Sequence, residues 1–301
     1  MRANTMTEAP VGDPAGAFDF CQKLADSHYE NFPVASRLIA RSLRRHVAVL
    51  YAFARIADDF ADEPQFEGVR KERLEDWRAQ LWAVGKTPAV HPVFLALETT
   101  LKELDLPKEP FDDLISAFLQ DCEKKRYATF EEVRDYCRRS ADPVGRVVLM
   151  IHGYRDPEFF KLSDRICTAL QLANFLQDLS VDLKKDRIYI PEEDFREFGY
   201  GEADMRMGVV NERFRSLMKF QWKRVRGLFD EGLPLAARLS WPLSWEIRLT
   251  WLGGVDILRK IHLAGYDTLH QRPALSKWDW ARLILKAVAT RKCPKRHERA
   301  A

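Results

Sequence analysis

At positions 171–182 the chain reads Gln171-Leu172-Ala173-Asn174-Phe175-Leu176-Gln177-Asp178-Leu179-Ser180-Val181-Asp182. This stretch lies in a run that starts near Glu158 and contains no Gly or Pro before Pro191, which predicts one unbroken helix. At ~100° per residue, its amides and carboxylates fall within roughly 80° of one helix face. The stretch therefore predicts a single polar stripe made of Gln171, Asn174, Asp178 and Asp182.

A second acidic stripe lies far upstream, in Tyr51-Ala52-Phe53-Ala54-Arg55-Ile56-Ala57-Asp58-Asp59-Phe60-Ala61-Asp62. Here Tyr51, Arg55, Asp58 and Asp62 span about 60° of a helix face by the same arithmetic. Carboxylates four residues apart repel each other unless a cation lies between them. Mg²⁺ prefers oxygen ligands and is usually bound by one or two carboxylates together with substrate phosphate. Two such stripes predict two helices that face each other across a cavity and hold divalent cations with a diphosphate.

Each stripe alone would also suit a solvated helix face with scattered acids. Both pairs are embedded among apolar residues, however, and a purely solvated helix would be more polar. The aromatic residues near the stripes are either liners of an apolar cavity or plain core; they are Phe32, Phe53, Phe175 and Trp251.

The chain has 301 residues, of which 46% are hydrophobic, enough to form a large core. Five cysteines, an odd number without a Cys-x-x-Cys pair, favour a reducing cytoplasm. The polar N-terminus lacks the apolar core of a signal peptide, and no run of ~18 apolar residues predicts a membrane span. We expect a disordered tail over 1–16, one domain over 17–290 and a basic tail over 291–301.

Apolar residues recur at helical spacing through most of the chain, which predicts an all-α fold. The break at Ser140–Gly145 is a kink or a joint between two helices, and 191–201 is a connector. Only Ile188–Ile190 alternates like a strand, and it is too short to build a sheet. The expected helices are 18–29, 36–63, 69–84, 91–104, 110–124, 130–154, 158–182, 212–229, 241–264 and 277–290.

The last helix is basic and amphipathic. Trp278, Trp280, Leu283 and Ile284 supply apolar anchors beside Arg282, Lys286, Arg291 and Lys292. The helix either docks on a membrane surface, with the protein peripheral at its inner face, or packs on the core. The cations gather at one end rather than along a face, which argues against a nucleic-acid partner.

From about Phe18 to Arg272 the chain resembles the head-to-head trans-isoprenyl synthases: squalene, dehydrosqualene and phytoene synthases. Their first aspartate-rich motif looks like Arg55-x-x-Asp58-Asp59-x-x-Asp62, and their second like Gln171-x-x-Asn174-x-x-x-Asp178-x-x-x-Asp182. The segment after the second motif matches Arg187-Ile188-Tyr189-Ile190-Pro191. The resemblance implies the all-α isoprenoid synthase fold, a single domain with helices around a central apolar cavity, together with Mg²⁺ and C15-derived diphosphate substrates.

Three segments are similar to one branch, the hopanoid-pathway hydroxysqualene synthases: 28–36, 140–146 and 167–175. Those enzymes ionise presqualene diphosphate, rearrange the cation and quench it with water, giving hydroxysqualene and diphosphate. The resemblance implies catalytic roles for Asp58, Asp62, Asp178, Asp182 and Tyr136, and metal binding by the four aspartates with Asn174. Expected substrate contacts are Tyr29, Asn31, Phe32, Tyr51, Arg55, Gln171, Asn174, Arg187 and Arg272.

The chain departs from the wider family at three places. A Ser-x-Ser-Phe element that contacts phosphate is here Tyr29-x-Asn31-Phe32, and Gln177 stands where a basic residue is common. Gly253-Gly254 occupies the region of a late tyrosine, which indicates close packing or a widened cavity. These changes suit an enzyme that performs only the second half-reaction.

Other functions remain open at this point. Within the class, the protein would condense two prenyl diphosphates to presqualene diphosphate, squalene or phytoene. A di-iron carboxylate protein needs Glu-x-x-His pairs, which the chain lacks. A non-catalytic relative acting in assembly would be free to lose its aspartates, and this chain keeps both pairs. No Gly-x-Gly-x-x-Gly dinucleotide motif is present, and the sequence leaves NADPH use open.

Overall fold

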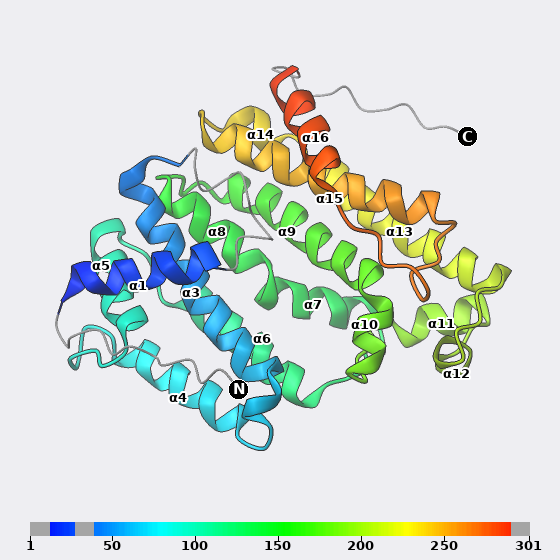
Figure 1. Cartoon of the computed structure of the whole chain (residues 1–301), viewed down its shortest axis with the longest axis horizontal. Helices are drawn as coiled ribbons and strands as arrows, with labels where there is room; N and C mark the ends of the chain where they lie inside the picture. Colours follow the sequence, from blue (N-terminus) through cyan, green and yellow to red (C-terminus); the bar gives the residue numbers. More distant parts are fainter. Residues whose placement is uncertain (1–12, 28–38, 290–301) are drawn as a thin grey trace. The chain divides into compact units, whose positions relative to one another are not determined.

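The computed structural model describes residues 13–27 and 39–289. Within these ranges the chain is helical with no β-strand, which confirms the all-α prediction (Figure 1). It forms two compact units: unit 1 contains residues up to 123 and 146–154, and unit 2 contains 124–145 and the residues from 155 onward. The chain passes between the units at three places, and one of them, 145/146, lies inside a helix.

Unit 1 is arranged around α3 (Arg41–Asp62), which contacts four other helices. Phe53 on α3 is fully buried, and its ring meets those of Trp77, Phe94 and Phe111 at centroid distances of 5.7, 6.0 and 5.2 Å. Each partner comes from a different helix, so this aromatic cluster fixes the orientation of α3. The helices around α3 are α1 (Pro14–Ser27), α4 (Arg70–Ala83), α5 (Pro92–Leu104) and α6 (Glu109–Glu123), with a 3₁₀ turn at Pro64–Phe66.

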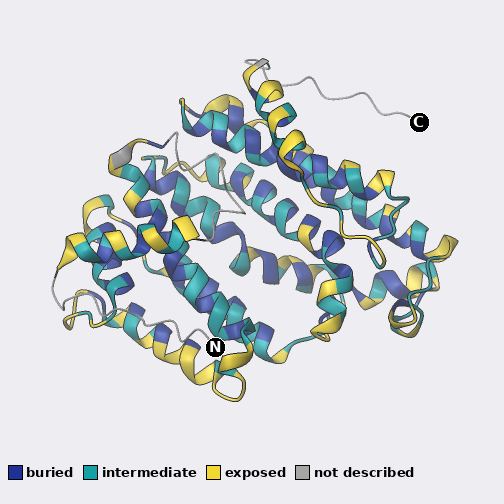
Figure 2. Ribbon diagram, viewed as in Figure 1, coloured by how far each residue is buried: buried dark blue, intermediate teal, exposed yellow. Residues whose placement is uncertain are grey.

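Unit 2 is built on α9 (Pro157–Gln177), which packs along α13 (Glu212–Gly232) and α15 (Leu243–Leu263). Helix α7 (Phe130–Ser140) also contacts α9, and α16 (Lys277–Ala289) lies on α15. Figure 2 shows the buried sides of α9, α13 and α15 in dark blue. The remaining elements are short: α10 (Leu179–Lys184), α11 (Glu192–Phe198), α12 (Glu202–Arg206) and α14 (Leu235–Arg238).

Local sequence sets several helix starts. Asp156 accepts a hydrogen bond from Glu158 N at 2.9 Å, and Pro157 occupies the first position of α9. Asn211 accepts one from Phe214 N at 3.0 Å at the start of α13. The Ser140–Gly145 break is a joint at Ala141 between α7 and α8 (Asp142–Ile151).

Two elements differ from expectation. The helix predicted over 158–182 is interrupted at Asp178, whose φ of −98° and ψ of 15° depart from helical values, so α10 starts in a new direction. The segment 191–201 is not a plain connector, because it contains α11 and leads into α12. Ile188–Ile190 forms no strand, and Ile188 N donates to Lys125 O at 3.0 Å.

Candidate active site

The first acidic stripe lies on α3. Arg55 reaches along this stripe: its Nη2 is 2.6 Å from Asp59 Oδ1, and its Nη1 is 3.6 Å from Asp58 Oδ2. Asp59 is therefore the nearer of the two acidic partners of Arg55. Asp58 keeps 43% of its side-chain surface exposed and so remains accessible to a ligand.

The electrostatics of α3 favour a cation. Desolvation raises the pKa of Asp58 to about 6, the Asp62 carboxylate raises it further, and Arg55 opposes the shift. Asp121 on α6 also raises the pKa of Asp58, and this buried acid was not among the residues predicted from the sequence. Burial likewise raises the pKa of Tyr51, while Arg55 lowers it. Because acids crowd this face, a divalent cation would relieve their mutual repulsion.

The second stripe is divided by the break at Asp178. Gln171 and Asn174 lie on α9, Asp178 lies at the junction, and Asp182 lies on α10. Asp182 N donates to Asp178 O at 2.9 Å, and Arg187 N donates to Asp182 O at 2.9 Å, which links the two acids and the following basic segment through the backbone. Gln171 and Asn174 are thus carried by one helix and Asp182 by the next, with Asp178 at the junction between them.

Arg272 contacts the second stripe through Asp178. Its Nε and Nη2 donate to the two oxygens of Asp178 at 2.6 and 3.1 Å, a two-point guanidinium–carboxylate contact. The pair joins residues that are 94 positions apart in the sequence. More than half of the Arg272 side chain, 53%, stays exposed, so its guanidinium is within reach of an incoming anion.

Gln177 supports the segment that carries Arg272. Its side chain is buried, and Nε2 donates to Pro273 O at 2.6 Å. Gln177 ends α9 and Pro273 follows Arg272, so this hydrogen bond places Arg272 beside Asp178. Sequence reasoning noted Gln177 only as a missing basic residue; its partner was invisible because Pro273 is distant along the chain.

Tyr136 and Arg187 are both buried in unit 2. The ring of Tyr136 lies 6.0 Å from that of Phe175 and 5.6 Å from that of Tyr189, and Phe175 stacks on Tyr189 at 3.7 Å. An aromatic cluster thus joins α7, the middle of the acidic stripe and the segment after α10. Its stacked rings form an apolar surface that would keep water away from a reactive intermediate.

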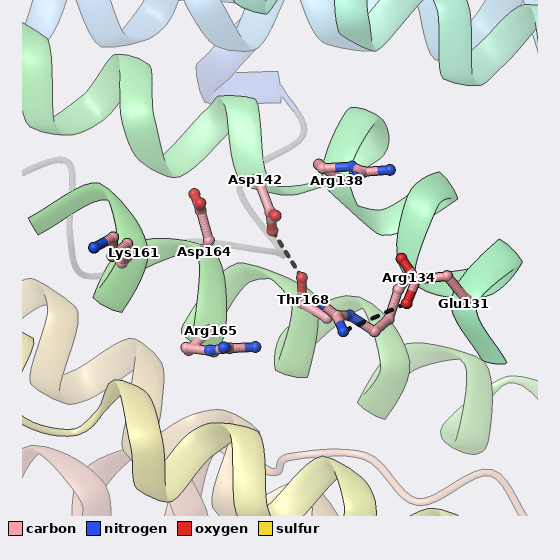
Figure 3. A pocket seen from close by; sticks show the side chains of 8 residues that line it. All are labelled: Glu131, Arg134, Arg138, Asp142, Lys161, Asp164, Arg165 and Thr168. Carbon is pink, nitrogen blue, oxygen red and sulfur yellow. Dashed lines mark hydrogen bonds and ion pairs between the residues drawn. The ribbon is translucent and has the colours of Figure 1, made fainter. Parts of the chain in front are cut away.

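Asp142 lines a cavity whose walls are mostly charged, away from the aromatic cluster. Its Oδ1 accepts a hydrogen bond from Thr168 Oγ1 at 2.8 Å, at the edge of a cavity of about 200 Å³ (Figure 3). The charged lining of this cavity does not suit a prenyl chain, so it is not the expected apolar cavity. The other lining residues are Glu131, Arg134, Arg138, Lys161, Asp164 and Arg165.

The glycine pair of α15 is a site of close packing. A Cβ at Gly254 would lie 2.4 Å from Phe229 Cζ and 2.9 Å from Leu170 Cδ2, whereas a Cβ at Gly253 would meet nothing nearer than 3.5 Å. The alternative of a widened cavity at Gly254 is therefore wrong. Phe53 and Trp251 belong to the core, since Phe53 is buried among aromatic rings and Trp251 Nε1 donates to Phe229 O at 2.7 Å.

Tyr29, Asn31 and Phe32 lie outside the described residues. Within the described part of the chain, no three His, Cys, Asp or Glu side chains gather into a metal site. Mg²⁺ fits the residues present nonetheless, because it takes one or two carboxylates and completes its oxygen shell with water and phosphate. The crowded, partly exposed acids on α3 meet that requirement.

The chain is similar to known proteins over most of its length. Residues 25–279 match the squalene/phytoene synthase family model. The phytoene synthase of Thermus thermophilus is 32% identical over 90% of this chain and 92% of its own length, and that of Arthrospira platensis is 29% identical over 87% and 89%.

Solved structures show the same fold. The squalene synthase HpnC from Alicyclobacillus acidocaldarius superposes with a TM-score of 0.81 at 42% identity, covering 84% of this chain and 96% of that one. A dehydrosqualene synthase superposes with a TM-score of 0.79 at 21% identity, over 92% and 98%. The isoprenoid synthase fold is thereby confirmed, and the chain belongs to the squalene/phytoene synthase family.

Proposed function

We propose that this protein is a hydroxysqualene synthase that converts presqualene diphosphate and water to hydroxysqualene and diphosphate. The observation that carries the proposal is Gln177. Where the wider family often has a basic residue, this amide is buried and bonded to Pro273 O, so it offers no charge to a second diphosphate. An enzyme that binds one diphosphate substrate has no need of that charge.

The acidic stripes supply the metal-binding groups. Asp58 and Asp62 on α3, with Asn174, Asp178 and Asp182, would hold Mg²⁺. The bound ions would neutralise the diphosphate as its bond to carbon breaks. Arg55, Arg187 and Arg272 offer planar forks that match phosphate oxygens. In this proposal, the ion pairs with Asp59 and Asp178 hold the guanidinium groups of Arg55 and Arg272 in place, and each guanidinium then binds the diphosphate of the substrate instead.

The aromatic cluster would protect the cation. The carbon–oxygen bond breaks with its electron pair on the diphosphate, and the cyclopropylcarbinyl cation rearranges. The faces of Tyr136, Phe175 and Tyr189 would stabilise positive charge and exclude water until rearrangement is complete. One water then adds to the cation and releases a proton. Asn174, whose side chain is exposed on α9, would hold that water.

Substrate choice tests the proposal. The full chain with Mg²⁺ and presqualene diphosphate, without a nicotinamide cofactor, should release a C30 alcohol and diphosphate. Farnesyl diphosphate alone should give no C30 product under the same conditions. A C30 product from farnesyl diphosphate alone would contradict the proposal.

A second candidate is condensation of two prenyl diphosphates to presqualene diphosphate, squalene or phytoene. It is favoured by the relatives, several of which are named phytoene synthases. Retention of both acidic stripes is compatible with either reaction. The same incubation separates the two, because only the condensing enzyme consumes farnesyl or geranylgeranyl diphosphate alone.

We also propose that the protein works in the cytoplasm at the inner face of the membrane. A C30 product is lipophilic and leaves water for lipid. No helix in residues 13–27 or 39–289 has the length and apolar character needed to cross a bilayer.

A further inference from the structure

Helix α16 is fixed on α15 through one of its faces. Leu283 and Ala287 are each 1% exposed, so Leu283 is not the membrane anchor expected from the sequence. Two ion pairs add to this contact: Arg282 Nη2 lies 2.7 Å from Asp256 Oδ2, and Lys260 Nζ lies 2.8 Å from Asp279 Oδ2. The ring of Trp280 fills the space beside Gly253. The helix therefore needs no other partner to remain folded.

A second apolar face of α16 points away from this contact. Trp278 is 86% exposed, Leu285 71% and Val288 59%, and Ala281 is also exposed. At ~100° per residue these four side chains fall within about 80° of each other, and we call them the outer stripe. Figure 2 shows α16 with yellow, exposed surface along its length. An apolar stripe left in water on a helix that is already packed marks an interaction surface.

Charge identifies the partner of the outer stripe. Residues 277–301 contain eight Lys or Arg and two Asp or Glu, a net charge of +6, whereas the whole chain carries +3, so the rest carries −3. Lys277 and Lys286 are exposed on the same helix. Apolar side chains flanked by cations match an anionic lipid surface. A second copy of this chain fits poorly, because pairing the stripes would bring two strongly basic segments together.

We propose that α16 docks the protein on anionic membranes through Trp278, Ala281, Leu285 and Val288, with Lys277 and Lys286 of the same helix against the lipid headgroups. The proposal rests on the proposed function in one respect: a C30 product gives the enzyme a reason to sit at lipid. Docking itself uses no residue of the acidic stripes, so the two proposals can fail separately.

Vesicle flotation tests the docking. The full chain should float with vesicles that contain phosphatidylglycerol, float less at high salt, and stay in solution with phosphatidylcholine alone. The variant Trp278→Ser/Leu285→Ser/Val288→Ser should bind at least about tenfold more weakly, because it removes the large apolar side chains that would be buried in lipid. Its turnover of detergent-dispersed presqualene diphosphate should equal that of the unaltered chain.

A matched control keeps this test specific. Val90 is 81% exposed and Met207 71%, and neither lies on α16, so Val90→Ser/Met207→Ser should bind vesicles normally. Unchanged flotation of the triple variant, or equal loss in the control, would overturn the proposal. So would sedimentation showing that the unaltered chain dimerises without lipid while the triple variant is a monomer, because that result assigns the stripe to a second copy.

Discussion

At the scale of single residues, the proposed role of the two acidic stripes is to bind metal and diphosphate. Each of Asp58→Asn, Asp62→Asn, Asp178→Asn and Asp182→Asn should lower kcat by about 10²-fold or more, because the metal supplies several kcal/mol of charge stabilisation. These carboxylates are not core residues, so circular dichroism should show an intact fold. Full turnover in both Asp58→Asn and Asp178→Asn would refute the metal assignment.

Gln177 is expected to act through Arg272 rather than on the substrate directly. Gln177→Leu removes the hydrogen bond to Pro273 O, which contributes about 1 kcal/mol, and loosens the segment that presents Arg272 to Asp178. We expect a several-fold rise in KM for the diphosphate substrate with a smaller change in kcat. The ionised side chain of Gln177→Glu cannot donate a hydrogen bond to Pro273 O, so this variant should show the same rise in KM as Gln177→Leu. A drop in stability with unchanged KM would assign Gln177 a purely structural role.

Residue types and spacing predicted that Asp58 and Asp62 lie on one helix, because aspartates four apart on a helix imply a shared face, and both lie on α3. They did not predict Asp121, whose effect on Asp58 depends on how α6 packs against α3. The pairing of Arg272 with Asp178 was equally hidden, since it joins segments that are distant in sequence. Such contacts arise from tertiary packing and leave no local pattern.

At the scale of elements, α15 offers a matched pair of glycines. A Cβ at Gly254 would overlap the buried Phe229 ring, so Gly254→Ala should destabilise the protein by roughly 1–3 kcal/mol. Gly253→Ala has room, and the better helix propensity of Ala should leave stability equal or raise it by up to about 1 kcal/mol. Urea unfolding of both variants measures the contrast. Equal stability of the two variants would contradict the close contact at Gly254.

Helix α5 begins with a titratable cap. His91 accepts a hydrogen bond from Val93 N at 3.2 Å through Nδ1, and burial lowers its pKa from 6.5 to about 4. Between pH ~6.5 and about 4, His91 is protonated in the unfolded chain but stays neutral in the folded chain. Stability should therefore fall by up to about 3 kcal/mol as the pH drops from about 6.5 to 4.

The variant His91→Asn isolates this effect, because Asn caps helices without titrating. Denaturant unfolding at neutral pH and near pH 5 should show a smaller loss of stability in the variant than in the unaltered chain. Identical losses in the two proteins would show that His91 does not carry the pH dependence.

Most helices were predictable because apolar spacing and Pro or Gly residues mark their extents. The break at Asp178 was not, since residues 158–190 contain neither Gly nor Pro. The helix is interrupted there by the non-helical dihedral angles of Asp178, which no residue type in this segment indicates. It follows that Asp182 is presented by α10, independently of Asn174 on α9.

At the scale of the whole molecule, the two units contain one acidic stripe each: α3 belongs to unit 1, and α9 with α10 to unit 2. The family match over residues 25–279 spans both units, which agrees with a single catalytic function for the chain. The expectation that both stripes serve one diphosphate was reached from their spacing alone. In the proposed reaction, the product depends on whether water or hydride adds to the carbocation. Residue spacing does not indicate which of the two adds.

The fate of oxygen tests the proposed reaction most directly. The full chain is incubated with presqualene diphosphate and Mg²⁺ in ¹⁸O-labelled water, without a nicotinamide cofactor, and the C30 product is analysed by mass spectrometry. Quenching by water predicts hydroxysqualene that carries one ¹⁸O atom. Squalene formed only after NADPH is added, with no alcohol along the way, would contradict the proposed reaction and identify a reductive synthase instead.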